Sequence, residues 1–339
     1  MNTDKKNTPI DIVIIWVDGN DPEWQKERAK YNPEGNTDSS VARYRDWDNL
    51  KYVFRGIEQF APWVNKVFFV TWWHLPKWLN IDCPKLKIVK HEDYIPAEYL
   101  PTFSTHPIEL NIHRINGLSE HFIYFNDDMF LIQKTKPEDF FKNGKPCDSA
   151  ILSVHSYSEA SYVSFAALRA TGLINKYFDF RRTIKANLSK WINPKYGKML
   201  LRSLVLLGCP MFPGFWQHHL PPSCCKSTYT ELWKKEYDLL NETSLRKFRH
   251  TLNVNQWFFR NWEIASGNFY PRSVKKTGKY FGISNIEDIY GIKKYIENQK
   301  GKMICLNDEV KNEDDFYEIK NTIALCLEKF MPDKSEFEI

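Results

Sequence analysis

The chain has 339 residues, of which 42% are hydrophobic and 26% charged. This composition excludes a disordered chain, a collagen and a coiled coil, and the length is sufficient for one large domain or two smaller ones with a buried core. Aromatic residues make up 15% of the chain, and the formal net charge of +5 is too small to indicate nucleic-acid binding by itself.

Apolar runs and helical patterns alternate along the chain. Taken in order, the predicted elements are a strand over 10–17, a helix over 49–60 with Asp48 as its N-cap, strands over 66–73 and 86–93, a helix over 107–118, a strand over 121–132 that runs into an acidic turn, and a last strand over 303–308. This alternation predicts an α/β fold: a Rossmann-like, mostly parallel central sheet with flanking helices and a helical, basic insertion.

The small net charge hides two opposite segments. Residues 169–202 contain nine Lys and Arg and a single acid, whereas residues 308–339 contain ten Asp and Glu and four Lys. The basic segment is a lid or acceptor-binding segment for an anionic polymer, a surface for the anionic inner leaflet of a membrane, or simply a solvated basic face. All three interpretations stay open from the sequence.

The cysteine pattern and the apolar tracts bear on the compartment. Seven cysteines without a Cys-x-x-Cys pair indicate reduced thiols. No signal peptide is visible behind the first nine residues, and the longest apolar tract, 199–216, is interrupted by an arginine and two prolines. We expect a cytoplasmic protein, with peripheral contact with the inner face of the cell membrane left open.

Acidic residues follow three of the predicted strands, at 16–21, 124–128 and 305–308. Ligands of open α/β sheets bind beyond the carboxyl ends of the strands. The adjacent pair Asp127 and Asp128 is costly unless a cation neutralises it, and Mg²⁺ prefers carboxylates together with substrate phosphates. The pair therefore predicts a metal site for a nucleotide or nucleotide sugar, with an Asp-rich turn as the alternative.

Basic side chains supply further candidates. Arg43, Arg45, Arg55 and Arg114 are candidate phosphate ligands, because a guanidinium matches phosphate oxygens, although each can equally be structural or solvated. His218 and His219 offer a candidate general base, with local hydrogen bonding as the alternative. No Gly-x-Gly-x-x-Gly or Walker loop is present, which disfavours dinucleotide oxidoreductases and P-loop enzymes.

Four blocks of the sequence resemble the Stealth family, which comprises bacterial capsular and exopolysaccharide sugar-phosphate transferases and the animal N-acetylglucosamine phosphotransferase. FIYFNDD after HRINGLSE is the most specific motif. The blocks lie in the family's order at 10–24, at 43–80 continuing through 100–131, at 217–227 with 248–267 beyond it, and at 303–309.

The resemblance implies transfer of a sugar-1-phosphate from a UDP-sugar to an acceptor sugar hydroxyl, with release of UMP, in capsular or exopolysaccharide synthesis. It implies a divalent metal, Mg²⁺ or Mn²⁺, a saccharide or lipid-linked oligosaccharide acceptor, and no nucleic acid as partner. The alternatives are a metal-dependent glycosyltransferase, which would release UDP, and a non-catalytic sugar-binding or membrane-associated assembly protein.

Roles follow from the matching positions. The expected catalytic residues are His219 as general base, Arg249 at the phosphorus and Asp128; the metal ligands are Asp127, Asp128 and Asp308; the donor-binding residues are Trp16, Val17, Asp18 and Asn126, with Arg45 and Arg114 added as phosphate ligands. Asp18 departs from the animal members, which have Asn there.

These roles suggest a division of the chain. We expect a flexible tail over 1–9, a nucleotide-sugar-binding α/β half over 10–150, a basic and apolar insertion over 151–216 that serves as lid, acceptor or membrane-surface segment, and a C-terminal half over 217–339 that completes the active site.

Overall fold

The computed structural model describes residues 8–32, 45–156 and 162–339. The strands are β1 (Ile10–Ile15), β2 (Val67–Thr71), β3 (Leu86–Lys90), β4 (His121–Asn126), β5 (Met129–Leu131), β6 (Phe141–Lys142), β7 (Lys145–Asp148), β8 (Ser223–Cys225), β9 (Tyr270–Pro271), β10 (Gly278–Ile283) and β11 (Met303–Asp308). The α-helices are α1 (Pro22–Tyr31), α2 (Leu50–Phe60), α3 (Thr105–Asn111), α4 (Pro137–Phe140), α5 (Tyr162–Tyr177), α6 (Phe180–Ala186), α7 (Leu188–Trp191), α8 (Met199–Leu206), α9 (Lys226–Lys235), α10 (Tyr237–Leu245), α11 (Trp257–Ala265), α12 (Val274–Thr277), α13 (Asp288–Glu297) and α14 (Glu313–Phe330).

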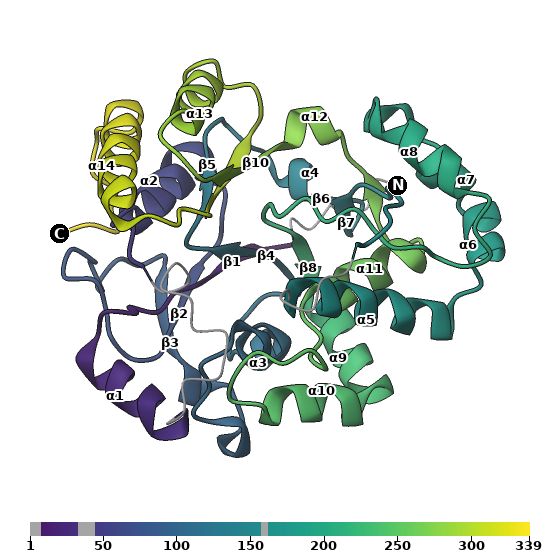
Figure 1. The fold of residues 1–339 in the computed structure, drawn as a ribbon, viewed down its shortest axis with the longest axis horizontal. Helices are drawn as coiled ribbons and strands as arrows, with labels where there is room; N and C mark the ends of the chain where they lie inside the picture. The colour runs from purple at the N-terminus through teal and green to yellow at the C-terminus, as the bar shows by residue number, and fades with distance from the viewer. Residues whose placement is uncertain (1–7, 33–44, 157–161) are drawn as a thin grey trace, which may run out of the picture.

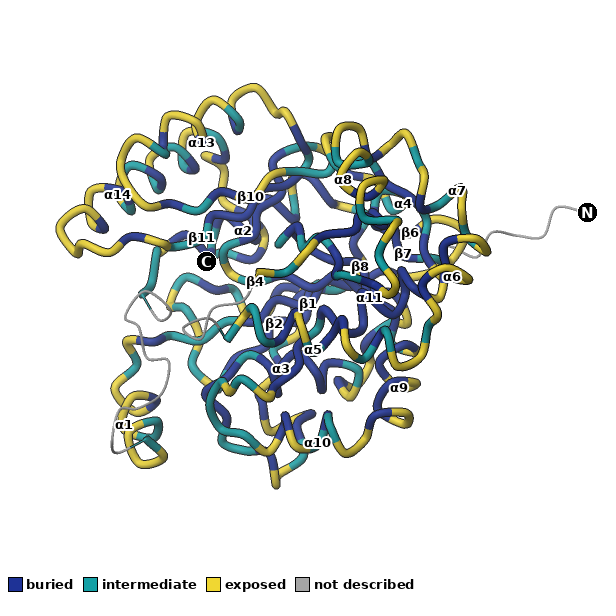
Figure 2. Tube along the Cα trace, turned by 45° about the vertical axis from the view of Figure 1, so that its right-hand side comes forward, coloured by how far each residue is buried: buried dark blue, intermediate teal, exposed yellow. Residues whose placement is uncertain are grey.

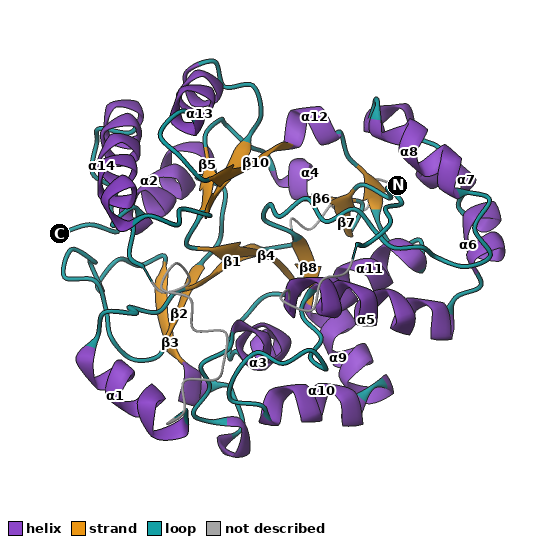
Figure 3. Cartoon of the chain, viewed as in Figure 1, coloured by secondary structure: helices purple, strands orange, loops and turns teal. Residues whose placement is uncertain are grey.

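The central sheet has five strands in the order β3-β2-β1-β4-β8 (Figures 1 and 3). The first four strands are parallel, and β8 runs antiparallel to β4 at the edge. Two smaller sheets, β10-β11-β5 and β6-β7-β9, mix parallel and antiparallel pairs. The predicted α/β fold with a mostly parallel sheet and flanking helices is confirmed.

Hydrophobic cores cover both faces of the central sheet. Side chains of a strand alternate between the faces, so Ile12 and Ile14 of β1 join the core under α2, α13 and α14, whereas Val13 and Ile15 join the core with α3, α5, α9 and α11. Figure 2 shows these inner segments as the continuous buried centre of the molecule. Burial on both faces explains the unbroken apolar runs that predicted β1 and β2.

The predicted strand over 121–132 is two strands in different sheets. β4 ends at Asn126 in the central sheet, and β5 starts at Met129 beside β11 in a three-stranded sheet. Asp127 and Asp128 form the turn between them, because two adjacent carboxylates cannot continue a strand buried on both faces. The acidic pair therefore lies where the chain passes from one sheet to the other.

Two helix boundaries differ from the predictions. Asp48 does not cap α2: its φ is 49°, its carboxylate pairs with Lys320, and the N-cap position is Asn49. Helix α3 starts before the predicted residue 107, with Ser104 as N-cap accepting a hydrogen bond from the His106 N–H, because Pro107 fits within a first turn. It ends at Asn111 and continues only as a short 3₁₀ turn.

Arg55 is structural rather than a phosphate ligand. It is buried, and its guanidinium donates to both carboxylate oxygens of Glu338, at 2.8 and 2.9 Å, and to the carbonyl oxygen of Met331 at 2.7 Å. These bonds tie the end of the chain to α2. Arg43 lies outside the described residues.

Helices α5 to α8 lie within the segment 151–216. Ala170 and Ile174 of α5 belong to the second core, and α5 packs against α11 (Figure 1). Helices α6, α7 and α8 continue as an arc along the outer edge of the molecule. In the described part of the chain, no helix has the length and apolar character needed to cross a membrane. The proposed boundaries between the four parts stay a prediction.

A close approach between α2 and β5 leads to a stability prediction. A Cβ atom added at Gly56 would lie 2.9 Å from the Leu131 carbonyl oxygen, which is backbone and cannot rotate away. We expect Gly56→Ala to destabilise the protein by about 1–3 kcal/mol in urea unfolding. Gly172→Ala in α5, where nothing lies within 4 Å of the added atom, is the matched control and should stabilise by roughly 0.5–1 kcal/mol. Equal effects of the two substitutions would contradict the packing argument.

Candidate active site

A cavity of about 490 Å³ opens beyond the carboxyl ends of β1, β4 and β11. Most of the predicted site residues line it, although they come from distant parts of the sequence. The lining includes Trp16, Val17, Arg45, Asn126, Asp127, Asp128, His219, Arg249 and Asp308. The central sheet and the three-stranded sheet therefore each contribute one wall.

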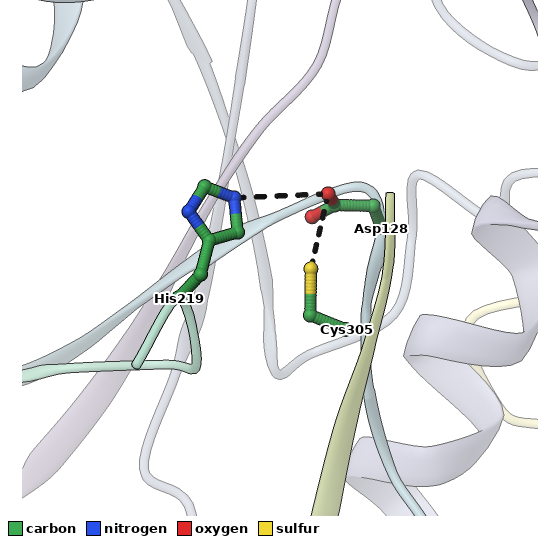
Figure 4. A group of neighbouring side chains, drawn as sticks. All are labelled: Asp128, His219 and Cys305. Atoms are coloured by element: carbon green, nitrogen blue, oxygen red, sulfur yellow. Dashed lines mark hydrogen bonds and ion pairs between the residues drawn. The ribbon is translucent and has the colours of Figure 1, made fainter. Parts of the chain in front are cut away.

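Asp128 lies at the centre of a small polar group in this cavity (Figure 4). Its Oδ2 is 4.0 Å from His219 Nε2 and accepts a hydrogen bond from the Cys305 thiol at 3.2 Å. The potential ligand atoms of these three residues lie within 4.8 Å of one another. Asp128 Oδ1 is buried and has no hydrogen-bond partner among the described residues.

The two adjacent carboxylates have perturbed acidities. Asp127 faces the open cavity, but surrounding protein atoms desolvate its carboxylate and Asp128 adds a like charge, which together raise the pKa of Asp127 to about 7. Burial also raises the pKa of Asp128, while the nearby His219 offsets part of this effect. A cation beside the pair would restore the ionised form of both carboxylates.

The donor set fits a hard divalent cation at Asp127 and Asp128. The unpartnered Oδ1 of Asp128 is the kind of buried oxygen that a cation satisfies, and carboxylates are the ligands that Mg²⁺ and Mn²⁺ prefer. Burial and the Asp128 carboxylate raise the pKa of Cys305 well above the usual range, so without a metal it is a thiol that donates a hydrogen bond to Asp128.

Asp308 and Arg45 line the cavity but are occupied with each other. Arg45 donates to both Asp308 oxygens, each at 3.1 Å, and to the Val310 carbonyl at 2.6 Å. Its guanidinium also lies over the ring of Phe316. In this structure Asp308 is ion-paired with Arg45, and the expected roles of Asp308 as metal ligand and of Arg45 as phosphate ligand stay predictions.

Two of the expected donor-binding residues lie outside the cavity. Asp18 is a turn residue: its Oδ1 accepts from the Asn20 N–H at 2.8 Å, and its own N–H donates to His74. Arg114 is exposed, donates to Asn111 and stacks over Trp233. The fold therefore does not bring Asp18 and Arg114 to the other site residues. Arg249 does line the cavity, and its Nη2 lies 3.4 Å from the Thr105 hydroxyl.

The backbone at His219 is strained. Its φ of 47° lies in the left-handed region, which a non-glycine residue adopts only when the surroundings impose it. Its side chain is 35% exposed and its ring packs edge-on against Tyr280 of β10. In this backbone conformation the accessible imidazole places its Nε2 4.0 Å from Asp128 Oδ2.

A buried ion pair holds the segment before His219 in place. Arg260 donates to both oxygens of Asp148 at 2.7 Å, and its Nη1 donates to the Trp216 carbonyl and to Gln217 Oε1. Burial alone would raise the pKa of Asp148, but Arg260 and its other cationic neighbours hold it well below its usual range. The pair thus fixes residues 216 and 217 directly before the two histidines.

His218 has a different function from its neighbour. It is buried, and burial together with Arg260 lowers its pKa to about 4, so the ring is neutral near neutral pH. Its Nδ1 accepts a hydrogen bond from the Leu220 N–H, and its Nε2 lies 3.1 Å from Arg272 Nη2 and 3.5 Å from Asp148 Oδ1. His218 is therefore a structural residue, and His219 is the histidine available in the cavity.

Family models match the chain at two places, and curated relatives match nearly all of it. Stealth conserved region 1 matches residues 8–35, and conserved region 2 matches residues 43–148. The capsular polysaccharide phosphotransferase WcwK of Streptococcus pneumoniae is 42% identical over 337 residues, covering 98% of this chain and 99% of the relative. The chain belongs to the Stealth family.

Other relatives that match nearly the whole chain are also named phosphotransferases. The receptor polysaccharide phosphotransferase WefC of Streptococcus oralis is 39% identical and covers 97% of this chain and 99% of its own. The exopolysaccharide phosphotransferase cps2G of Lactiplantibacillus plantarum is 36% identical over 332 residues. Among solved structures, the galactosyltransferase LgtC covers 94% of this chain and 95% of its own at 8% identity and a TM-score of 0.42. A similarity at that level carries no argument about the site.

The Stealth site also contains an acid that the sequence reasoning missed. Glu109 of α3 is buried in the cavity wall, where Gln256 N–H donates to its Oε2 and the Tyr124 hydroxyl lies 3.1 Å from its Oε1. The same hydroxyl lies 2.6 Å from Asn126 Oδ1. A hydroxyl carries one hydrogen, so a protonated Glu109 can donate to Tyr124 while Tyr124 donates to Asn126.

A charged residue within an apolar stretch was the available signal for Glu109. It lies between Ile108 and Leu110 in the predicted helix, at a position that is buried in the structure. Buried carboxyl groups are rare unless they serve a function or pair with a partner. Because Glu109 lies on a helix, it lacks the position at a strand end that marks Asp127 and Asp128.

Glu109 leads to a prediction on the pH dependence of stability. Burial raises its pKa from 4.5 to about 7, so the folded state binds more protons than the unfolded state between these values, and stability falls as the pH rises through them. Glu109→Gln should not show this loss. The difference in free energy of unfolding between Glu109→Gln and wild type should therefore shift in favour of the variant by about 2–3 kcal/mol between about pH 5 and about pH 8. Urea unfolding at both pH values is the measurement, with exposed Glu98→Gln as control; a parallel pH profile of Glu109→Gln and wild type would refute it.

Proposed function

We propose that this Stealth protein transfers a sugar-1-phosphate from a UDP-sugar to a hydroxyl of a saccharide or lipid-linked oligosaccharide acceptor, forming a phosphodiester and releasing UMP in capsular or exopolysaccharide synthesis. Its membership of the family and its near full-length match to named phosphotransferases make it a phosphotransferase enzyme. The single observation that carries the finer proposal is the meeting of Asp127, Asp128, His219 and Arg249 in one cavity.

The reaction leaves the sugar's anomeric carbon untouched. The acceptor oxygen attacks the β-phosphorus of the donor, the bond from this phosphorus to the bridging oxygen breaks, and UMP leaves with that oxygen. Catalysis then consists mainly of aligning the acceptor with the phosphorus and neutralising the diphosphate charge. A cavity that is accessible and that joins acids, an arginine and a histidine supports both tasks.

The residues of the cavity have complementary tasks in this proposal. Asp127 and Asp128 would hold a divalent cation, which supplies positive charge at the diphosphate when bound. Arg249, which is anchored at the Thr105 hydroxyl, faces the same cavity and stabilises charge on the phosphoryl oxygens. His219 takes the acceptor's proton, a contribution typically of about a hundred- to ten-thousandfold in rate.

Chromatography of the released nucleotide tests the proposal directly. The purified enzyme is incubated with a panel of UDP-sugars, Mg²⁺ or Mn²⁺, and mono- and oligosaccharide acceptors. UMP is the expected product, and its release should stop when EDTA removes the metal. UDP instead of UMP would replace the proposal by the glycosyltransferase alternative. UMP release that persists unchanged in both Asp128→Ala and His219→Ala would refute the assigned site.

A further inference from the structure

Helix α8 (Met199–Leu206) turns an apolar face towards solvent. Ser203 is buried, and its hydroxyl oxygen accepts a hydrogen bond from the Leu152 N–H at 3.0 Å, which fixes one side of the helix to the molecule. Leu201 and Val205 lie on the opposite side at the helical spacing of four residues, and they are 66% and 82% exposed. A helix that only faces water carries polar residues there.

The neighbouring segments extend this apolar character. Figure 2 shows the arc of α6, α7 and α8 as a largely exposed rim of the molecule. We call the exposed large apolar side chains of this rim the apolar rim; its members are Leu188, Ile192, Leu201, Leu204, Val205 and Met211. Six large apolar side chains are thus exposed within 24 consecutive residues, and exposing apolar surface of this kind to water costs free energy.

Cations accompany the apolar rim, and acids are missing from the same stretch. Residues 180–216 contain no Asp or Glu. The exposed cations of the stretch that form no ion pair within the described residues are Arg181, Arg182, Lys185, Lys195, Lys198 and Arg202. On the helical wheel, Lys198 and Arg202 both lie to one side of the exposed Leu201 and Val205, and the exposed Leu204 lies to the other side. The exposed face of α8 is thus apolar with a basic margin along one side.

We propose that the apolar rim docks on the surface of an anionic lipid bilayer. In this arrangement Leu201 and Val205 enter the boundary between headgroups and acyl chains, and the flanking cations contact lipid phosphates. An anionic polysaccharide would pair with the cations but would leave the apolar side chains in water. A second copy docked through the same face would cover the apolar side chains but offer no acid to the cations, because this stretch contains no Asp or Glu. At eight residues α8 lies in the plane of the surface and does not span it.

Vesicle sedimentation with the full chain tests this proposal. We expect binding to vesicles of phosphatidylcholine mixed with phosphatidylglycerol, weaker binding at high salt, and little binding to phosphatidylcholine alone. The double variant Leu201→Ser with Val205→Ser should lower the partition coefficient by about tenfold or more. The charge reversal Lys198→Glu with Arg202→Glu should lower it by at least about tenfold.

The controls carry the same substitutions elsewhere on the surface. Leu325→Ser removes a side chain that is 72% exposed on α14, and Lys293→Glu with Lys300→Glu reverses two exposed charges near α13. These variants should bind like wild type. The proposal is overturned if wild type binds no anionic vesicle at any salt, if the controls lose as much binding, or if light scattering shows a dimer that Leu201→Ser with Val205→Ser dissociates.

Discussion

Replacing Asp128 by Asn should reduce UMP release by about a thousandfold or more. The substitution keeps the size of the side chain but removes the negative charge that faces His219 and that, with Asp127, forms the proposed cation site. It also removes the carboxylate that accepts the Cys305 hydrogen bond. Steady-state rates at saturating donor, measured at several Mn²⁺ concentrations, separate a loss of metal affinity from a loss of turnover.

The comparison for Asp128→Asn is an acid outside the cavity. Asp82 is exposed in the turn before β3 and does not line the cavity. Asp82→Asn should therefore retain the wild-type rate. Thermal unfolding of both variants shows that the fold is intact. An Asp128→Asn enzyme that is folded and turns over within about threefold of wild type would remove Asp128 from the mechanism.

Replacing Arg260 by Met should destabilise the protein by about 3 kcal/mol. The substitution leaves the buried Asp148 carboxylate without the two hydrogen bonds at 2.7 Å that Arg260 donates. It also releases the Trp216 carbonyl and Gln217, which lie directly before the histidines. We therefore expect turnover to fall as well, even in conditions where the variant is fully folded, because His219 loses its imposed position.

Urea unfolding is the measurement for Arg260→Met, and an exposed arginine is the control. Arg181 of α6 is exposed and forms no ion pair within the described residues, and surface substitutions of this kind usually change stability by about 0.5 kcal/mol or less. Arg181→Met should accordingly change the unfolding midpoint little. A similar loss for both variants would show that the buried pair makes no special contribution to stability.

Elements with a strong local pattern were predictable from the sequence. The apolar runs of β1, β2 and β11 predicted strands because these segments are buried on both faces, and the acids after β4 marked a turn. The local pattern could not show that this turn joins two sheets. Sheet membership depends on pairing between β5 and β11, which are more than 170 residues apart.

In the candidate site too, local motifs were predictable from the sequence and contacts between distant residues were not. Sequence motifs identified Asp127, Asp128 and His219, which the fold brings together in the cavity. They did not reveal that Arg45 pairs with Asp308, because this contact joins residues 263 positions apart. The expected phosphate-binding position of Arg114 differs for a related reason. Arg114 follows α3 closely in sequence, but the 3₁₀ turn places its exposed guanidinium over the ring of Trp233 and outside the cavity.

The junction between β4 and β5 has a consequence for how the enzyme fails on heating. Asp127 and Asp128 bridge the central sheet and the small β10-β11-β5 sheet, and the Leu306 N–H of β11 holds the Asp128 carbonyl at 2.9 Å. The small sheet has few strands, so it is the candidate for partial opening below the melting temperature of the whole molecule. Activity would then disappear while most of the helical signal remains, and amide exchange would rise first in β10 and β11. Engineering for heat tolerance in this enzyme would accordingly begin at the junction between the central sheet and the β10-β11-β5 sheet rather than in the hydrophobic cores.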